Sequence, residues 1–297
     1  MSESQFSKPF PLVKWVGGKR QLQVPILRKI EEVFDRENST YYEPFFGGGA
    51  ILFALEPKKS FISDINGGLV NLYKHVRDTP EKVKLELKRF EIEYNQLAPD
   101  EQLSYFLNVR SVFNAKENGV FVNRLGILGA ASFLFLNKAG FNGMYRENAT
   151  GEFNIPFGKR TSVSLFEDSN IDSVSNIFQN VDIQEQPYYK TVASAKPGDL
   201  IYFDPPYAPL TKTSSFEGYN SSNLGGFDQA ALRKLVDDLT EKSVFCIVSN
   251  SSAEIIEDLY KDYTMAPLTA NRAISASAQG RKSVKEYLID NFSQAQR

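Results

Sequence analysis

The sequence predicts an α/β fold with a mainly parallel sheet, interrupted by a helical insertion that carries a β-hairpin. Two observations lead to this prediction. β-rich runs alternate with helical patterns at residues 40–64 and again at 181–290, as in folds that wind helices over both faces of a parallel sheet. Between these two regions, residues 69–136 carry only helical patterns.

The predicted strands and their flanking helices follow in chain order. "TYYEPFF" (40–46) predicts a first strand, "GGGAILFAL" (47–55) a turn that opens a helix, and "SFIS" (60–63) a second strand ending at Asp64. Further β-rich runs lie at 181–185, 200–203, 243–249 and 284–290, with a weaker strand near 263–265. Helices are predicted at 21–34 and after Asp228, a good cap that precedes an apolar stripe of Leu232, Leu235, Val236 and Leu239.

The insertion combines helices with a segment rich in glycine and asparagine. Its helical patterns cover residues 80–97, 100–113 and 125–136. Within the segment 137–159, the stretch 144–155 predicts two short strands around a turn at Asn148–Gly151. We therefore expect one α/β domain formed by residues 1–70 and 175–297, and an inserted domain formed by residues 71–174.

Composition narrows the classes of protein. The 297 residues are 42% hydrophobic and 24% charged, which is typical of a globular protein. One cysteine and one histidine argue against a disulfide, a thiolate cluster or a histidine metal site, so we expect no metal. The absence of a signal-peptide pattern or a membrane-spanning apolar run predicts a cytoplasmic protein. The net charge is −2, yet residues 267–285 hold four cations and no acid. One face can still bind a polyanion, but an ordinary solvated loop is the favoured interpretation of this run by itself.

The first strand leads into the glycine-rich stretch "EPFFGGGA" (43–50). Glycines at such a turn let a ligand approach the backbone closely. Asp64 follows Gly47 by 17 residues at the end of the next strand, where an acid can accept both hydroxyls of a ribose. Nucleoside binding is one interpretation. Ordinary turn chemistry, with Asp64 as a helix cap, is the other.

A later strand ends in "IYFDPPY" (201–207). Asp204 falls at the carboxyl end of the strand, the edge at which open α/β sheets bind ligands. The Asp204 side chain and the Pro205 carbonyl can accept the two N–H bonds of an exocyclic amine, while Pro206 stiffens the turn and Tyr207 can stack on a planar ring. The alternative is a polar strand end with a stiff turn.

Several motifs in this order resemble the Dam family of DNA adenine-N6 methyltransferases, including the Dam-like modification enzymes of GATC restriction systems. They are "KWVGGKR", "EPFFGGG", "SDIN", "FNGMYRENATGEFNIPFG", "DPPYAPL" and "SNSS", which together span residues 14–252. The resemblance implies a Rossmann-like methyltransferase sheet and S-adenosylmethionine as methyl donor. It also implies that residues 1–70 and 175–297 are the catalytic domain and that residues 71–174 recognise double-stranded DNA.

The resemblance also implies site residues. The methylation site would consist of Asp204, Pro205, Pro206 and Tyr207. The cofactor would contact Trp15, Lys19, Phe45, Gly47, Gly49, Asp64, Ile65 and Asp204. DNA would contact Lys14, Phe141, Asn142, Met144, Arg146, Pro156 and Lys159, with Phe141 as a wedge in the base stack and Arg146 on a guanine. Without the family, a small aromatic core with a surface arginine would explain the same segment.

Two positions depart from the family pattern. Many members have arginine where this chain has Lys159, and lysine keeps a phosphate contact but loses a bidentate one. The family often uses a backbone amide near the end of the third strand to bind the cofactor adenine. Gln186 would take this role here, but the assignment stays open because the adjacent Pro187 has no N–H to donate.

The predicted reaction is methylation of a flipped-out adenine at N6, within GATC. N4-cytosine methylation and a catalytically inactive DNA-binding relative are the alternatives. C5-cytosine methylation needs a thiolate, and the only cysteine, Cys246, lies within a predicted core strand. We expect a monomer or weak dimer, with a companion restriction endonuclease acting separately as one option. The polar stretch 208–227 after Tyr207 predicts a lid that orders on binding.

Overall fold

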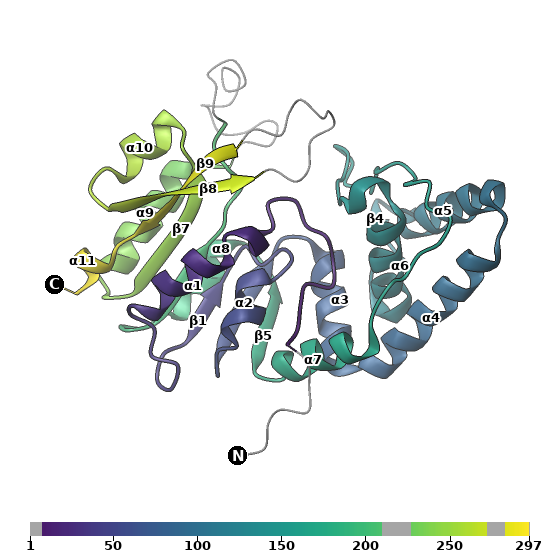
Figure 1. Ribbon diagram of the computed structural model, residues 1–297, viewed down its shortest axis with the longest axis horizontal. Coiled ribbons are helices and arrows are strands. Elements are labelled where there is room, and N and C mark those ends of the chain that lie inside the picture. The colour runs from purple at the N-terminus through teal and green to yellow at the C-terminus, as the bar shows by residue number, and fades with distance from the viewer. Residues whose placement is uncertain (1–7, 210–226, 272–282, 297) are drawn as a thin grey trace. The chain divides into compact units, whose positions relative to one another are not determined.

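The computed structural model is a mixed α/β protein and describes residues 8–209, 227–271 and 283–296 (Figure 1). Most of the predicted lid and most of the cationic run at 267–285 lie outside these residues. The chain divides into two compact units. The first comprises residues 1–19, 47–56 and 64–185, and the second comprises residues 20–46, 57–63 and 186–297. The assignment of catalytic and recognition roles to parts of the chain stays a prediction.

Six strands of the seven-stranded central sheet belong to the second unit. Their order is β2 (Ser60–Asp64), β1 (Tyr41–Glu43), β6 (Leu200–Phe203), β7 (Phe245–Ser251), β9 (Ser283–Asp290) and β8 (Thr264–Asn271). The first four are parallel, and β9 is antiparallel to both of its neighbours. The seventh strand, β5 (Val181–Glu185), is grouped with the first unit, as is Asp64 at the end of β2. The predicted mainly parallel sheet is confirmed.

The strand β6 is the best-buried part of this sheet, because all four of its side chains are enclosed. It lies between β1 and β7 and runs parallel to both. Parallel neighbours end at the same edge, so Glu43 at the end of β1 and Asp204 after β6 leave the sheet on one side. Strand β2 lies on the other side of β1, which makes the β1–β6 pair the point where strand order reverses, the usual ligand position in such sheets.

Helices of the second unit contribute apolar side chains to its interior. They are α1 (Gln23–Glu31), α8 (Tyr188–Thr191), α9 (Gln229–Thr240), α10 (Glu254–Tyr260) and α11 (Phe292–Ala295). The predicted cap of α9 is confirmed, since the Asp228 side chain accepts the Ala231 N–H at 2.9 Å. Leu232, Val236 and Leu239 of the predicted stripe are buried in the core.

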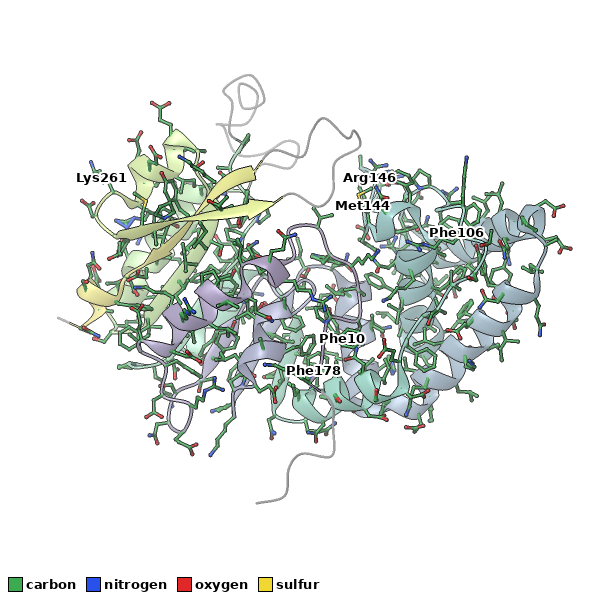
Figure 2. The ribbon with its side chains drawn as sticks, in the orientation of Figure 1. Phe10, Phe106, Met144, Arg146, Phe178 and Lys261 are labelled. Atoms are coloured by element: carbon green, nitrogen blue, oxygen red, sulfur yellow. The ribbon has the colours of Figure 1, made fainter. Side chains whose placement is uncertain are left out.

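The first unit is built around the apolar helix α6 (Gly126–Ala139), which packs against α3 (Gly67–Asp78), α4 (Pro80–Gln96) and α5 (Pro99–Phe113). Helix α6 is buried along most of its length, which explains why its sequence is hydrophobic all round. Phe106, labelled in Figure 2, packs on Phe135 of α6 at a ring distance of 6.4 Å. The unit also contains α2 (Ala50–Leu55) and α7 (Asp168–Phe178). The helical insertion is therefore confirmed.

Two hairpins accompany these helices. The predicted turn at Asn148–Gly151 is confirmed, although its arms pair only through one bridge, between Glu147 and Phe153. The other hairpin joins β3 (Lys116–Glu117) and β4 (Val120–Phe121) and was not predicted. Its turn is Asn-Gly, with both residues at positive φ, and this dipeptide between short β-prone runs was the missed signal.

Asparagine side chains hold irregular segments of the first unit in place. In each of five cases, one carboxamide accepts the N–H and donates to the C=O of a single residue distant in the sequence. The pairs are Asn71 with Gly126, Asn95 with Val163, Asn114 with Phe153, Asn137 with Lys14, and Asn170 with Phe10. Each asparagine thus satisfies both the N–H and the C=O of one backbone residue, which a neighbouring strand would do in a sheet.

Within the described parts of the chain, no helix is long and apolar enough to span a membrane. The same residues contain no group of three or more histidine, cysteine, aspartate or glutamate side chains that could hold a metal ion.

Candidate active site

The Asp204 loop leaves the sheet directly after β6. Asp204 and Tyr207 are half-buried, Pro205 is buried and Pro206 is exposed. The Tyr207 hydroxyl donates to the Glu286 carboxylate of β9 at 2.7 Å. The predicted methylation-site residues therefore form one continuous segment, and Glu286 is a neighbour that sequence reasoning missed.

Buried amides fix the backbone of this loop. The Gln229 side chain donates to the Pro206 carbonyl at 2.8 Å, and the Asn250 side chain accepts the Ala208 N–H at 3.2 Å. Asn250 also donates to the Gln229 side chain at 3.0 Å, while the Ser251 hydroxyl donates to the Ala208 carbonyl at 2.6 Å. The "SNSS" motif thus holds the loop that follows Asp204, and such rigidity suits a group that must be aimed.

Tyrosines around Asp204 are held in their neutral form. Burial raises the pKa of Tyr207 far above its usual value, and the negative charges of Asp204 and Glu286 raise it further. Burial raises the pKa of Tyr202 as well, with Asp204 the next cause, and the Tyr202 hydroxyl is hydrogen-bonded to Ser249 at 2.8 Å. Tyr207 is therefore a neutral hydrogen-bond donor and an aromatic surface, not a base.

An aromatic cluster lies at the carboxyl end of β1. Phe45 stacks on Tyr188 with ring centroids 5.2 Å apart, and it also contacts Phe203 and Phe227. Phe45, Tyr188 and Phe227 are half-buried, so part of this apolar surface remains accessible. Sequence reasoning found Phe45 but missed Tyr188, which directly follows the unexplained Pro187.

In the first unit, Asp64 is tied to the glycine-rich turn. One carboxylate oxygen accepts the Gly47 N–H at 3.0 Å, and the other accepts the Asn66 N–H at 2.9 Å. Asn66, not Asp64, caps α3 by accepting the Leu69 N–H, so the helix-cap interpretation of Asp64 is wrong. Burial raises the pKa of Asp64, while these backbone N–H groups oppose that rise. Each carboxylate oxygen can accept a second bond, which fits two ribose hydroxyls.

The turn itself is shaped by close packing. Gly47 has a φ of 47°, and a Cβ there would lie 2.6 Å from the Trp15 ring. Trp15 stacks on Tyr145, with ring centroids 5.6 Å apart. The Lys19 ammonium donates to the Gly17 carbonyl at 2.8 Å, and Ile65 beside Asp64 is 79% exposed. The roles of Trp15, Lys19, Gly47, Asp64 and Ile65 in cofactor binding stay predictions.

Six of the seven predicted DNA contacts come from residues 141–159 of the first unit, and the seventh is Lys14. The Phe141 N–H donates to the Pro156 carbonyl at 2.9 Å, and Arg146 donates through Nε to the Asn154 side chain at 2.8 Å. Figure 2 labels Met144 and Arg146 at the same end of this unit. Met144 is half-buried, whereas the other predicted contacts are exposed: Lys14, Phe141, Asn142, Arg146, Pro156 and Lys159.

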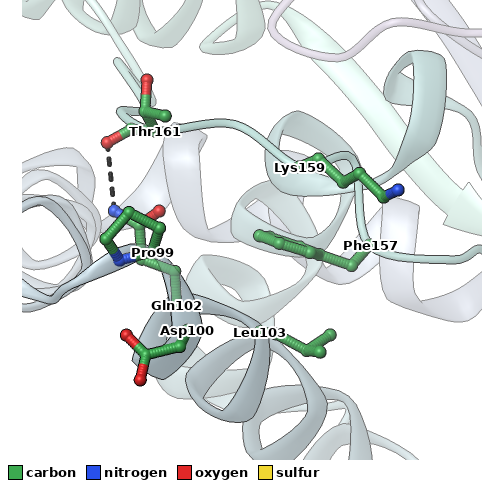
Figure 3. A pocket seen from close by; sticks show the side chains of 7 residues that line it. All are labelled: Pro99, Asp100, Gln102, Leu103, Phe157, Lys159 and Thr161. Carbon is green, nitrogen blue, oxygen red and sulfur yellow. Dashed lines mark hydrogen bonds between the residues drawn. The ribbon is translucent and has the colours of Figure 1, made fainter.

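A small pocket adjoins Lys159, which has a φ of 54°. Its volume is about 230 Å³, and its wall includes none of the residues predicted to bind the cofactor. Figure 3 shows the bond that closes one side, from the Gln102 side chain to the Thr161 carbonyl at 3.0 Å. The remaining lining residues are Pro99, Asp100, Leu103 and Phe157. The pocket lies between the start of α5 and the loop that carries Lys159, so we do not assign it to the cofactor.

The mainly parallel sheet, the glycine turn with its carboxylate and the Asp-Pro-Pro-Tyr loop are consistent with a Rossmann-like methyltransferase. The family model for D12 class N6 adenine-specific DNA methyltransferases matches residues 15–274, and the chain belongs to this family. It is a site-specific DNA adenine-N6 methyltransferase. The family resolves the choice between adenine N6 and cytosine N4, and methyltransferases generally take S-adenosylmethionine as methyl donor.

Similar proteins span nearly the whole chain. Identity is 34% over 284 residues with the Type II methyltransferase M1.LlaDCHI of Lactococcus lactis subsp. cremoris, covering 95% of each protein. It is 35% over 294 residues with the Type II methyltransferase M.MjaIII of Methanocaldococcus jannaschii, covering 95% of this chain and 99% of that protein. It is 31% over 277 residues with a DNA adenine methylase of Vibrio cholerae serotype O1, covering 93% and 94% respectively.

Proposed function

We propose that the enzyme methylates the N6 amine of adenine within GATC in duplex DNA, after the adenine has been flipped out of the helix. The observation that carries this proposal is the Asp204 loop. Its backbone is bonded at Pro206 and Ala208 by the buried side chains of Gln229 and Asn250. A loop fixed at both places can hold two hydrogen-bond acceptors at a constant separation, which a flexible strand end cannot do.

The chemistry of adenine explains why such acceptors matter. The lone pair of the N6 amine is delocalised into the ring, so the amine is a poor nucleophile. The Asp204 carboxylate and the Pro205 carbonyl accept its two N–H bonds, which biases the nitrogen toward sp³ geometry and directs its lone pair outward. S-adenosylmethionine, when bound, supplies a methyl group on a positively charged sulfur. Orientation of the amine is then the main contribution of the chain, a contribution that can be large.

Tyr207 would stabilise the flipped base. Flipping costs about a few kcal/mol, and stacking on an aromatic side chain returns roughly 1–3 kcal/mol. The bond from the Tyr207 hydroxyl to Glu286 limits rotation of the ring. Because its pKa lies far above the usual range, Tyr207 presents no negative charge to the base.

Two sets of residues would bind the cofactor, namely Asp64 with the glycine-rich turn, and the aromatic cluster around Phe45. Asp64 would accept the ribose hydroxyls, because each of its oxygens already bonds one backbone N–H and retains a further acceptor position. Ile65, Gly47 and Gly49 would contact the nucleoside, with Trp15 packed under the turn. Phe45, together with Tyr188, would supply an apolar surface for the purine.

Residues 71–174 would read the DNA sequence, and residues 1–70 with 175–297 would carry catalysis. Exposed Arg146 suits a guanine in the major groove, and Lys159 suits a phosphate. The relatives named Type II methyltransferases favour a restriction–modification setting with a separately acting endonuclease. We keep a monomer or weak dimer as the expected state.

One pair of variants tests this proposal. Asp204→Asn should strongly reduce methyl transfer to a GATC duplex while leaving DNA binding largely intact, because the amide keeps one acceptor oxygen but loses the negative charge that strengthens its bond to the amine. Asp182→Asn is the control, since it removes a carboxylate from an exposed position of β5. Transfer of labelled methyl groups and a gel-shift assay give the two readouts. Full activity of Asp204→Asn would contradict the assigned role.

A further inference from the structure

Asn137 of α6 is fully buried and binds two separate segments of the first unit. Its carbonyl oxygen accepts the Lys14 N–H at 3.0 Å, and its amide donates to the Lys14 carbonyl at 2.9 Å and to the Gly143 carbonyl at 3.0 Å. One carboxamide thus joins the "KWVGGKR" segment to the turn Phe141–Gly143. These segments are more than 120 residues apart in the chain.

The turn is an Asn-Gly pair, the two residue types that adopt the left-handed backbone region most readily. Asn142 has a φ of 55° and Gly143 a φ of 66°, two successive residues in the left-handed region. Gly143 also packs on the Lys14 side chain, since a Cβ at Gly143 would lie 2.5 Å from the Lys14 Cδ.

A second contact joins the two segments through Trp15, which follows Lys14, and Tyr145, which lies two residues after Gly143. Trp15 stacks on Tyr145 with an interplanar angle of 19°, and both rings stack on Phe133 of α6. The first segment and the turn are therefore joined twice, by a buried amide and by a stack of rings. Both joints rest on the same face of α6.

We infer that Asn137 is a positioning residue for target-site discrimination. It holds Lys14 and the turn Phe141–Gly143 at one fixed separation, so the exposed Lys14, Phe141 and Asn142 meet DNA as a single preset surface. The inference rests on the proposed function, in which these three side chains contact the target site. It adds that discrimination depends on a buried amide that touches no DNA.

The experiment compares Asn137→Ala with Asn170→Ala. Asn170 is 2% exposed and clamps Phe10 through the same pair of bonds, at 2.9 and 3.1 Å, but makes no bond to the turn. Both variants should lower thermal stability, because each leaves a backbone N–H and C=O without the side chain that bonds them. Only Asn137→Ala should lower the ratio of kcat/KM for the preferred site over sites with one changed base pair, by about 10- to 100-fold.

A second pair of variants tests the same inference if Asn137→Ala does not fold. Gly143→Ala introduces a methyl group against Lys14, whereas Gly119→Ala introduces one at a similar φ of 80° in open space. We expect Gly143→Ala to reduce discrimination and Gly119→Ala to leave it unchanged. Unchanged discrimination in every foldable variant at Asn137 and Gly143, with stability lowered as in the controls, would overturn the inference.

Failure of the proposed function would be recognised separately. Discrimination is measured around whichever site the wild-type enzyme prefers, and that site is determined first. A preferred site other than GATC rejects the GATC proposal and leaves the comparison of variants valid. A wild-type enzyme with no site preference would refute both.

Discussion

Replacing Tyr207 with phenylalanine separates its two proposed contributions. The change keeps the aromatic ring and removes only the hydroxyl that donates to Glu286 at 2.7 Å. A hydrogen bond to a charged group contributes about 1.5–3 kcal/mol. Glu286 is half-buried, so its released carboxylate can reach water and the lower end of that range applies. About 1.5 kcal/mol corresponds to a roughly tenfold loss.

We expect this loss in kcat/KM for DNA, because the bond orients the ring on which the flipped adenine would stack. Tyr207→Ala should lose roughly a further 1–3 kcal/mol, the contribution of stacking itself. The assay is steady-state transfer of labelled methyl groups to a GATC duplex. Tyr287→Phe is the matched control, since Tyr287 makes the same kind of bond to Glu257, at 2.6 Å.

A double-mutant cycle with Glu286→Ala makes the test stricter. If the tyrosine acts through this bond, Tyr207→Phe should cost little once Glu286 has been removed. Wild-type kcat/KM for Tyr207→Phe, or full additivity in the cycle, would refute the reasoning.

Two further predictions concern the cofactor and the recognition hairpin. Affinity for S-adenosylmethionine should fall as the pH is lowered toward the pKa of Asp64, which burial raises above its ordinary value, because the protonated acid loses acceptor capacity; Asp64→Asn should abolish this pH dependence in titration calorimetry. Arg146→Ala should cost about 1–3 kcal/mol of discrimination at one base pair, measured on duplexes with single changes, and equal losses on all duplexes would argue against a base contact.

Local patterns in the sequence were sufficient to predict most elements. The strand over 200–203 was predicted at the bounds observed for β6, because four consecutive apolar residues are bounded by turn signals. β8 is longer than predicted. It lies at the edge of the sheet and contains Pro267, and proline within a run weakens the sequence signal while edge strands tolerate it.

The residues of the methylation site could be predicted from the sequence only where they are neighbours within one motif. Asp204 through Tyr207 are contiguous, so the motif contains them. Glu286 lies 79 residues from its partner Tyr207, and a pattern within a window of the sequence cannot report such a pair. Asn137 is a further case, since its partners are set by how α6 packs and not by neighbouring residues. Contacts of this kind come from tertiary structure alone.

Sequencing of single DNA molecules after methylation in vitro tests the central claim most directly. An unmethylated plasmid is treated with the enzyme and S-adenosylmethionine, and every modified base is mapped on both strands. The account predicts N6-methyladenine at GATC throughout the plasmid and background elsewhere. Methylation of adenine in another sequence would reject the GATC assignment, and methylated cytosine or no methylation by the folded enzyme would contradict the proposed reaction itself.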